Sequence, residues 1–377
     1  MKPGNEVSDV LLRNTGYLHQ FVRNSWQLRT INALAVCRTP ALGGHIDICS
    51  NPECHKLHIS YNSCRNRHCP KCQGEKREQW MEARHKELFN APYYHVVFTL
   101  PSQFNRACMY RSSLMYNLLF KVAWSVIRDF AKNKKFLGAK TGMIAILHTW
   151  GQNLSLHPHL HCIVPGGGLT KSNKWKPVRG KGRYLFPVKA MGQVFRARFV
   201  EAIRSELEYD NIGYKVLFEK PWVVYCKKPF WGPRQVIEYL GRYTHKIAIG
   251  NHRIKNINNQ SVTFSAKDYR KDGKKHLITL PDGEFIRRFC LHILPKGFTR
   301  IRHYGILSSA LKKICIAILQ DQLGKPEEIH GKVQKHRTCL ICGRGELITL
   351  LSFNNRGPPS NEFVQYLTDL YFTSLPA

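Results

Sequence analysis

Three histidines between residues 156 and 161 have the spacing of metal ligands. His157, His159 and His161 stand at alternate positions of an apolar, β-prone stretch, so in a strand their side chains would point to one face. Imidazoles that converge in this way can bind a divalent cation. With 18 histidines in the chain, about one His-x-His pair arises by chance. From these residues alone, core histidines are an equally good interpretation.

The flanking residues predict a β-hairpin around these histidines. Residues 160–164 are apolar and end at a proline and three glycines, which is typical of a buried strand. An earlier apolar run, residues 143–147, ends at His148. If residues 151–158 close a hairpin between the two strands, His148 lies beside the His159 and His161 pair.

Tyr239 and Tyr243 are candidate nucleophiles. Residues 235–245 predict a helix that follows Gly232 and Pro233, and tyrosines four apart on a helix carry their hydroxyls on one face. The 16 tyrosines give about 0.7 such pairs by chance, so a packed aromatic stripe is the alternative interpretation. In a basic domain that also holds a histidine site, two hydroxyls indicate covalent attack on a phosphodiester.

The charge predicts a nucleic-acid partner. Lys and Arg total 58 against 25 Asp and Glu, a formal net charge of +33, which favours a polyanion. The basic residues are spread along the chain and interleaved with aromatic residues, which argues against a membrane-surface helix. A hydrophobic content of 43% is enough for a core and for two or three domains. The first residues do not have the pattern of a signal peptide, and no apolar run approaches the length of a membrane-spanning helix. We therefore predict a cytoplasmic protein without membrane contact.

A cysteine cluster between residues 49 and 72 predicts a structural zinc site. In a reducing compartment such clusters are metal ligands rather than disulfides, and a zinc ribbon needs four tetrahedral ligands. We assign Cys49, Cys54, Cys69 and Cys72. Cys64 and His68 compete for one of these positions, because four residues separate Cys49 from Cys54.

A second, isolated cysteine pair lies near the C-terminus. Cys339 and Cys342 have the spacing of a zinc knuckle, and His330 and His336 could complete a site. Without a second knuckle nearby, the sequence favours two unligated thiols.

Together these patterns predict an α+β chain of four regions. They are a helical segment at 1–40, a zinc-binding domain at 41–88, a domain of strands and helices at 89–255 that holds the histidines and tyrosines, and a mixed, basic C-terminal region at 256–377 with a loosely ordered tail. Basic residues in three of these regions are expected to contact DNA: Arg65, Arg67, Lys71, Arg242, Lys246, Arg287, Arg288, Lys296, Arg300 and Arg302.

The chain resembles the rolling-circle insertion-sequence transposases of the HUH class, the group typified by insertion sequence ninety-one. The matching stretches occur in the same order from about residue 42 to residue 307. The wide spacing between Cys49 and Cys54 in this chain departs from the usual first knuckle of the family. The matching stretches are Tyr61–Gln73, Val97–Leu100 with Pro101, His157–Gly168, Tyr239–His245 and Phe285–Gly305.

The resemblance implies an HUH endonuclease fold, in which a central antiparallel sheet flanked by helices carries the His-x-His pair. It implies that His159 and His161 are metal ligands and that Tyr239 and Tyr243 are nucleophiles. The third ligand is expected to be His148, as in relaxases of the wider class, with His157 as the alternative.

The implied activity is nicking of single-stranded DNA at transposon ends and its rejoining to target DNA through a 5′-phosphotyrosine. The expected cofactors are Mg²⁺ or Mn²⁺ at the histidines and Zn²⁺ at the cysteines; no nucleotide is expected, since the chain has no Gly-x4-Gly-Lys-Ser/Thr loop. Two alternatives stay open: a plasmid replication initiator or relaxase with the same chemistry, and a zinc-ribbon DNA-binding protein without catalysis. The zinc ribbon and residues 294–305 favour the transposase. The sequence does not indicate an oligomeric state.

Overall fold

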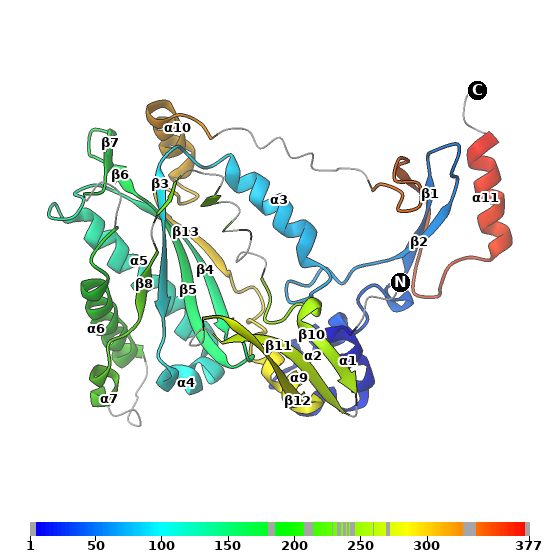
Figure 1. Ribbon diagram of the computed structural model, residues 1–377, viewed down its shortest axis with the longest axis horizontal. Coiled ribbons are helices and arrows are strands. Elements are labelled where there is room, and N and C mark those ends of the chain that lie inside the picture. The colour runs from blue at the N-terminus through cyan, green and yellow to red at the C-terminus, as the bar shows by residue number, and fades with distance from the viewer. Residues whose placement is uncertain are drawn as a thin grey trace. The chain divides into compact units, whose positions relative to one another are not determined.

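The computed structural model describes residues 5–179, 185–206, 214–227, 229–231, 235–236, 239, 241, 246–258, 260–268, 272–326 and 337–373. The chain forms two compact units, which Figure 1 shows as a ribbon. One unit combines Met1–Gln73 with Ile329–Ala377, and the other spans Gly74–Glu328. These boundaries differ from the four regions expected from the sequence, because the C-terminal segment packs with the N-terminal one.

The larger unit is built on an antiparallel sheet in the order β13-β4-β5-β3-β8, and β9 also pairs with β3. β5 is therefore an interior strand with partners on both sides, and it carries the three histidines. The strands are β3 (Pro92–Thr99), β4 (Gly142–Trp150), β5 (Leu156–Pro165), β8 (Val224–Cys226), β9 (Phe230–Trp231) and β13 (Ile301–Gly305). This arrangement confirms the predicted mixed α+β class with a central antiparallel sheet.

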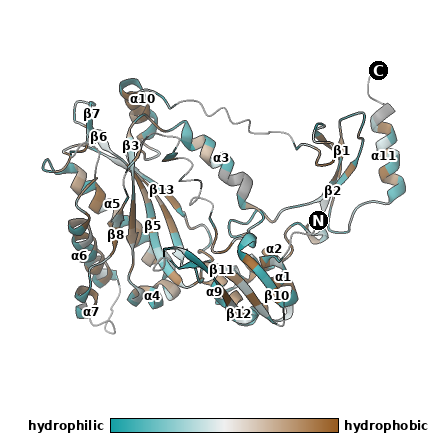
Figure 2. Cartoon of the chain, viewed as in Figure 1, coloured by the Kyte–Doolittle hydropathy of each residue, from teal (hydrophilic) through white to brown (hydrophobic). Residues whose placement is uncertain are grey.

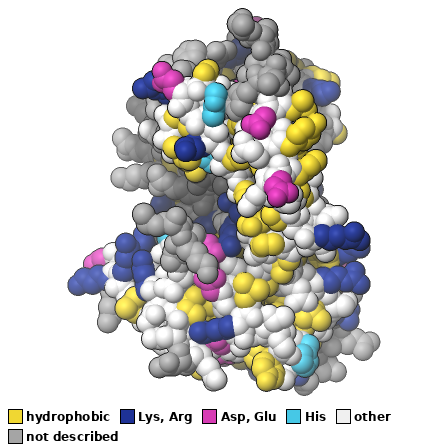
Figure 3. Space-filling model, turned by 90° about the vertical axis from the view of Figure 1, so that its right-hand side faces the viewer, with side chains coloured by type: hydrophobic (Ala, Val, Ile, Leu, Met, Phe, Trp, Pro, Cys, Tyr) yellow, Lys and Arg dark blue, Asp and Glu magenta, His cyan; other side chains and the backbone are white. Residues whose placement is uncertain are grey.

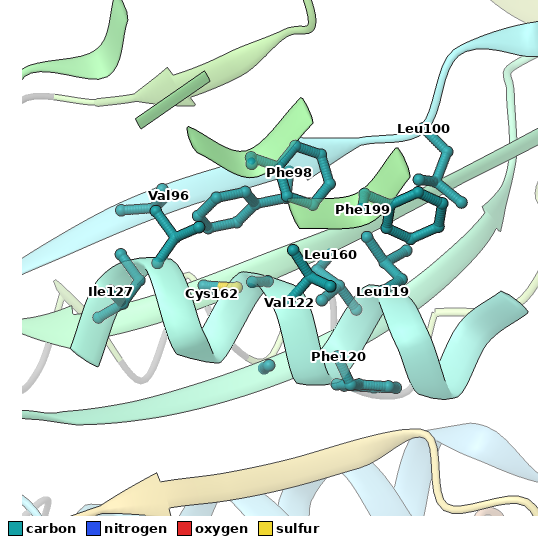
Figure 4. Close-up of a cluster of buried hydrophobic side chains, with 14 of the residues drawn as sticks. Val96, Phe98, Leu100, Leu119, Phe120, Val122, Ile127, Leu160, Cys162 and Phe199 are labelled. Atoms are coloured by element: carbon teal, nitrogen blue, oxygen red, sulfur yellow. The ribbon is translucent and has the colours of Figure 1, made fainter. Parts of the chain in front are cut away.

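Helices cover one face of this sheet. α5 (Ser112–Lys132) has apolar residues at helical spacing along its buried side, seen as brown patches in Figure 2. Figure 4 shows Phe98 of β3 and Leu160 and Cys162 of β5 packed against Val122 of α5 and Phe199 of α6 (Val188–Glu206). The described residues of this unit also form α3 (Gln73–His85), α4 (Asn105–Tyr110), α7 (Tyr214–Glu219), α9 (Asp282–Cys290) and α10 (Lys312–Leu323).

The opposite face of the sheet has its own smaller core. Strand alternation sends Tyr93, Ile144 and Ile163 to this face, where Val236 and Tyr239 pack against them. Because His148, His159 and His161 are in phase with these residues, their side chains also lie on this face and away from α5. The apolar core on the first face thus fixes the direction of the histidines on the second.

A second sheet, β10-β11-β12, packs with α9. It consists of β10 (Ile254–Asn258), β11 (Ser261–Asp268) and β12 (Lys274–Pro281), and a short ribbon pairs β6 (Gly167–Leu169) with β7 (Trp175–Pro177). The turn from β11 to β12 includes Asp272 and Gly273, both at positive φ (49° and 74°), as the sequence predicts for an Asp-Gly hairpin.

The smaller unit combines both ends of the chain. Its sheet has the order β14-β1-β2, and β14 pairs antiparallel with β1 from Gly44↔Phe353 to Cys49↔Leu347. A helix, α11, occupies residues for which the sequence predicted a loosely ordered tail; Val364 and Thr368, four residues apart, are buried on one side of it. The elements are α1 (Val7–Arg13), α2 (Ser25–Ala35), β1 (Gly44–Cys49), β2 (Leu57–Tyr61), β14 (Leu347–Phe353) and α11 (Asn361–Thr373).

None of the helices in the described residues has both the length and the apolar character needed to cross a membrane.

Candidate functional site

His148, His159 and His161 form a cluster on β4 and β5. His148 is the direct cross-strand partner of His159, and His161 follows on the same face. One ring nitrogen from each histidine lies within 4.8 Å of the others. His157 is exposed on β5 and is not part of this cluster. The structure therefore groups His148, and not His157, with the His159 and His161 pair.

Hydrogen bonds fix which nitrogens these rings can offer to a metal. Nδ1 of His159 lies 2.7 Å from the carbonyl oxygen of His157, to which it donates. Nδ1 of His161 lies 2.8 Å from Nε2 of His95. In both ligand candidates Nδ1 is hydrogen-bonded, so coordination of a metal would use Nε2.

Burial keeps the imidazoles of His159 and His161 neutral. It lowers the pKa of His159 to about 4 and that of His161 well below its usual value, with further contributions from the neighbouring histidines and Lys246. Neutral imidazole is the form that binds a metal. His159 and His161 thus have the donor type and protonation state that a divalent cation requires at neutral pH.

Tyr239 is placed next to this cluster by the segment after β9. Tyr239 is helical, as are Gln235, Val236 and Gly241, and it is 9% exposed. Gly241 lets the segment approach α3, since a Cβ at this position would lie 2.2 Å from Sδ of Met81. Tyr243 and Arg242 lie outside the described residues.

His95 connects Tyr239 to the histidine cluster. The hydroxyl oxygen of Tyr239 lies 2.9 Å from Nδ1 of His95, and Nε2 of His95 is the atom bonded to His161. His95 is 2% exposed, and burial together with the charge of Lys227 lowers its pKa to about 3. A hydrogen-bonded series therefore runs from the tyrosine hydroxyl to a candidate metal ligand.

The sequence alone did not single out His95. Its strand is recognisable, but the face on which His95 lies depends on the pairing of β3 with β5. That pairing sets Val97 opposite His161 and His95 opposite Ile163, which brings His95 to the face of the cluster. A single histidine in a strand carries no signal of this kind.

Two lysines lie close to the site. Lys227 is exposed, and its Nζ lies 5.5 Å from the ring centre of Tyr239. Lys246 has a pKa lowered by burial and by the charges of Arg253 and Lys267, so several cations share this region. Figure 3 shows groups of Lys and Arg side chains (dark blue) and scattered Asp and Glu side chains (magenta) on one face of the molecule.

Several other basic residues expected to contact DNA make contacts within the protein. Arg287 and Arg288 bind Glu284, each at 2.6 Å, and this lowers the pKa of Glu284 to about 2. Lys71 pairs with Glu6 at 2.6 Å, while Arg65, Arg67 and the exposed Lys296 lie on loops.

Arg300 and Arg302, also predicted to contact DNA, make contacts within the protein as well. Arg300 is 9% exposed and donates to the carbonyl oxygen of Lys246 at 3.1 Å. Arg302 packs over the rings of Phe120 and Phe298, at 4.2 and 5.2 Å. These guanidinium groups hold parts of the protein together, and their contact with DNA stays a prediction.

The cysteines form two clusters in place of the one predicted site. Cys69 and Cys72 lie with Cys37 and Cys64, a set that we call the N-terminal cluster. Cys49 and Cys54 lie with Cys339 and Cys342, which we call the two-ended cluster; within each cluster the four Sγ atoms lie within 4.8 Å of one another. The single site of Cys49, Cys54, Cys69 and Cys72 is thus replaced, and Cys64 is a member rather than a rival.

The cysteines form two clusters because the hairpin of β1 and β2 separates the Cys49–Cys54 pair from the Cys69–Cys72 pair. Cys49 ends β1, whereas the residues after β2 lead to Cys64 and Cys69 at the other end of the hairpin. Each pair must therefore find partners elsewhere in the chain. Cys339 and Cys342, expected as unligated thiols, lie against Cys49 and Cys54.

The N-terminal cluster has the chemistry of a zinc site. Cys72 Sγ lies 3.5 Å from that of Cys37 and 3.7 Å from that of Cys64. Hydrogen bonds from Cys64 and Cys69 lower the pKa of Cys37, which favours the thiolate, the form that binds zinc. His68, the other rival from the sequence, is not part of it.

Comparisons with known proteins find similarity to transposases. One family model, described as "Putative transposase", matches residues 142–314, and another, described as "Transposase zinc-binding domain", matches residues 12–100. The chain is 38% identical over 394 residues to "Putative transposase y4qJ" of Sinorhizobium fredii, covering 95% of this chain and 98% of that protein. It is 26% identical over 294 residues to "Transposase for insertion sequence element IS801" of Pseudomonas savastanoi pv. phaseolicola, covering 75% of this chain and 70% of that protein. No solved structure matches the chain.

Proposed function

The chain belongs to the family of insertion sequence ninety-one type transposases, and from this premise we propose that it is an HUH endonuclease. In this proposal it nicks single-stranded DNA at the ends of its element, forms a 5′-phosphotyrosine, and rejoins strands in rolling-circle transposition. The observation that carries the proposal is the hydrogen-bonded series from Tyr239 through His95 to His161, which ends at the cluster of His148, His159 and His161.

The histidine cluster is suited to a divalent cation by its donor set. Nδ1 of His159 and Nδ1 of His161 take part in hydrogen bonds, so Nε2 of each would be the ligand atom, and His148 supplies the third imidazole. A bound Mg²⁺ or Mn²⁺ would supply Lewis-acid stabilisation of the charge on the scissile phosphate. Magnesium prefers oxygen ligands, so manganese is the better match to three imidazoles in vitro.

Coordination at His161 would also set the direction of the hydrogen bonds toward Tyr239. If Nε2 of His161 is a ligand, its Nδ1 carries the proton and donates to Nε2 of His95. His95 then carries its own proton on Nδ1 and donates to the hydroxyl oxygen of Tyr239, 2.9 Å away. A donor at this atom stabilises negative charge on the oxygen as it becomes a nucleophile. His95 is thus a positioning residue.

The proposed reaction balances without a nucleotide cofactor. The Oη–P bond of the phosphotyrosine forms as the P–O3′ bond breaks, the phenol loses its proton, and the released 3′ oxygen takes one up. The new ester keeps the energy of the phosphodiester, so a 3′-hydroxyl can later reverse the step. A second tyrosine, Tyr243, would allow two successive transfers.

A labelled oligonucleotide from the element's end tests the proposal. Incubated with Mn²⁺ or Mg²⁺, the wild-type protein is expected to form a covalent adduct that survives denaturing electrophoresis, and peptide mass should locate it on Tyr239 or Tyr243. The Tyr239→Phe, Tyr243→Phe double variant should form none. As a matched control, Tyr110→Phe removes an exposed hydroxyl elsewhere and should keep the adduct.

Two results would reject the proposed endonuclease activity. One is the absence of any adduct with the wild-type protein; the other is an undiminished adduct in the double variant. Binding of the oligonucleotide without an adduct would support the alternative, a zinc-ribbon DNA-binding protein without catalysis. Adduct formation only with Mg²⁺ would reject the manganese preference alone.

A further inference from the structure

We propose that Cys49, Cys54, Cys339 and Cys342, the two-ended cluster, bind a second structural zinc ion that joins the C-terminal segment to the N-terminal one. The matching zinc-binding family model ends at residue 100, so it does not include half of these ligands. The zinc-binding unit of the protein would then be discontinuous in sequence and would hold two zinc ions.

The spacing of the sulfur atoms fits zinc and not disulfides. Sγ of Cys49 lies 3.6 Å from that of Cys342, and Sγ of Cys54 lies 3.8 Å from that of Cys339. A tetrahedron with Zn–S bonds of about 2.3 Å places its sulfurs about 3.8 Å apart. A disulfide would require about 2.05 Å. The N-terminal cluster has the same spacing, 3.5 and 3.7 Å.

The backbone around this cluster leaves room for the ligands and little more. A Cβ at Gly345 would lie 2.2 Å from Sγ of Cys49, so any other residue here would displace the thiol. The backbone N–H of Gly345 also donates to Sγ of Cys342 at 3.4 Å. Such N–H···S bonds stabilise the thiolate form.

An imidazole from outside the four cysteines contacts the Cys339 thiol. Nε2 of His58, on β2, lies 3.2 Å from Sγ of Cys339. A donor at this distance orients a metal-bound thiolate and offsets part of its charge. Gly345 and His58 thus contact the thiols of Cys342 and Cys339 in ways that do not depend on a disulfide.

A neighbouring ion pair holds the same two segments together. Arg337, two residues before Cys339, donates to both carboxylate oxygens of Asp47 at 2.6 and 2.9 Å. Asp47 is fully buried on β1 and also accepts from Thr349 of β14 at 2.7 Å. The cysteines of the C-terminal segment are therefore held against β1 by contacts other than their own.

Zinc content tests the proposal directly. The measurement uses the full chain in a His159→Ala, His161→Ala background, so that the histidine cluster does not contribute metal. We expect two zinc ions per chain by elemental analysis, and one in the Cys339→Ser, Cys342→Ser variant. The Cys226→Ser, Cys315→Ser variant removes two thiols outside both clusters and should keep two.

Further variants keep the test decisive if the double serine variant fails to fold. Cys342→His preserves a ligand type that zinc accepts and should keep two ions, whereas Gly345→Ala should lose one. Cobalt substitution should give the visible absorption of tetrahedral thiolate coordination, reduced by half in the variants that lose a site. A content of one zinc in the parent chain, or two in both the double serine variant and Gly345→Ala, would overturn the proposal.

Hydrogen exchange tests whether the ion joins the two segments. Loss of the two-ended cluster should speed amide exchange of β1 and β14 at least tenfold, because metal binding is coupled to local folding. Exchange of β4 and β5 should not change. Unchanged exchange in β1 and β14 would overturn the joining role.

Discussion

The hydroxyl oxygen of Tyr239 lies 2.9 Å from Nδ1 of His95, a residue that touches candidate ligand His161 through its other nitrogen. The nucleophile proposed for strand transfer and the proposed metal site therefore share one buried side chain. Their separation in sequence is large, and the pairing of β3 with β5 brings them together.

His95→Ala should slow nicking about 100-fold, because a misplaced nucleophile loses the alignment that the reaction needs. His95→Asn keeps a donor near the position of Nδ1 and should recover part of this loss. His95→Gln places its amide near the position of Nε2, toward His161, and should recover less. Single-turnover nicking rates measure the effect, and a KM change with unaltered kcat would contradict the positioning role.

Removal of a ligand should weaken metal binding at the histidine cluster. Mn²⁺ affinity, followed by the electron spin resonance of the free ion, should fall at least 100-fold in His161→Ala and in His159→Ala. The exposed His157 lies outside the cluster, so His157→Ala is the matched control and should bind Mn²⁺ nearly as well as the wild type. Equal losses in all three variants would reject the assigned ligand set.

Lys246→Ala should weaken the binding of single-stranded DNA and should make that binding less dependent on salt concentration. If Lys246 neutralises one phosphate, the slope of log K against log salt should fall in magnitude by about 0.7. Fluorescence anisotropy at several salt concentrations measures this slope. Lys220→Ala, an exposed lysine away from the histidines, should leave it unchanged, and an unchanged slope in Lys246→Ala would rule out a phosphate contact.

The buried His292 should make the protein less stable in mild acid. Nε2 of His292 donates to the carbonyl oxygen of Leu154 at 3.0 Å, and Nδ1 lies 3.2 Å from the Thr149 hydroxyl. Burial lowers the pKa of His292 to about 4. Between the ordinary histidine pKa of about 6.5 and this value, the unfolded chain binds a proton that the folded chain does not.

The free energy of unfolding should therefore be independent of His292 above pH 6.5 and fall as the pH drops from there to 4. The contribution of this group is about 3 kcal/mol over that range, at about 1.4 kcal/mol per pH unit. His292→Gln keeps a donor toward Leu154 and cannot titrate. Urea unfolding of both proteins between pH 8 and pH 4 should show a shallower decline in the variant; parallel curves would contradict the assignment.

The local features of the site could be predicted from the sequence. Alternating histidines in an apolar segment predict a strand with one histidine-bearing face, and a run ending at His148 predicts the neighbouring strand of a hairpin. Both depend only on the period of a strand and on residues that are close in sequence. The resemblance to a known family added the separate roles expected of His159 and Tyr239.

The tertiary structure decided which distant residues meet. His95 reaches the cluster because β3 pairs with β5 in one register, and a shift of one residue would turn it to the other face. Likewise, Cys49 and Cys54 find Cys339 and Cys342 because β14 pairs with β1. Knuckle spacing indicates that each pair can bind a metal, but the choice of partner pair depends on long-range strand pairing. No local pattern in the sequence encodes that choice.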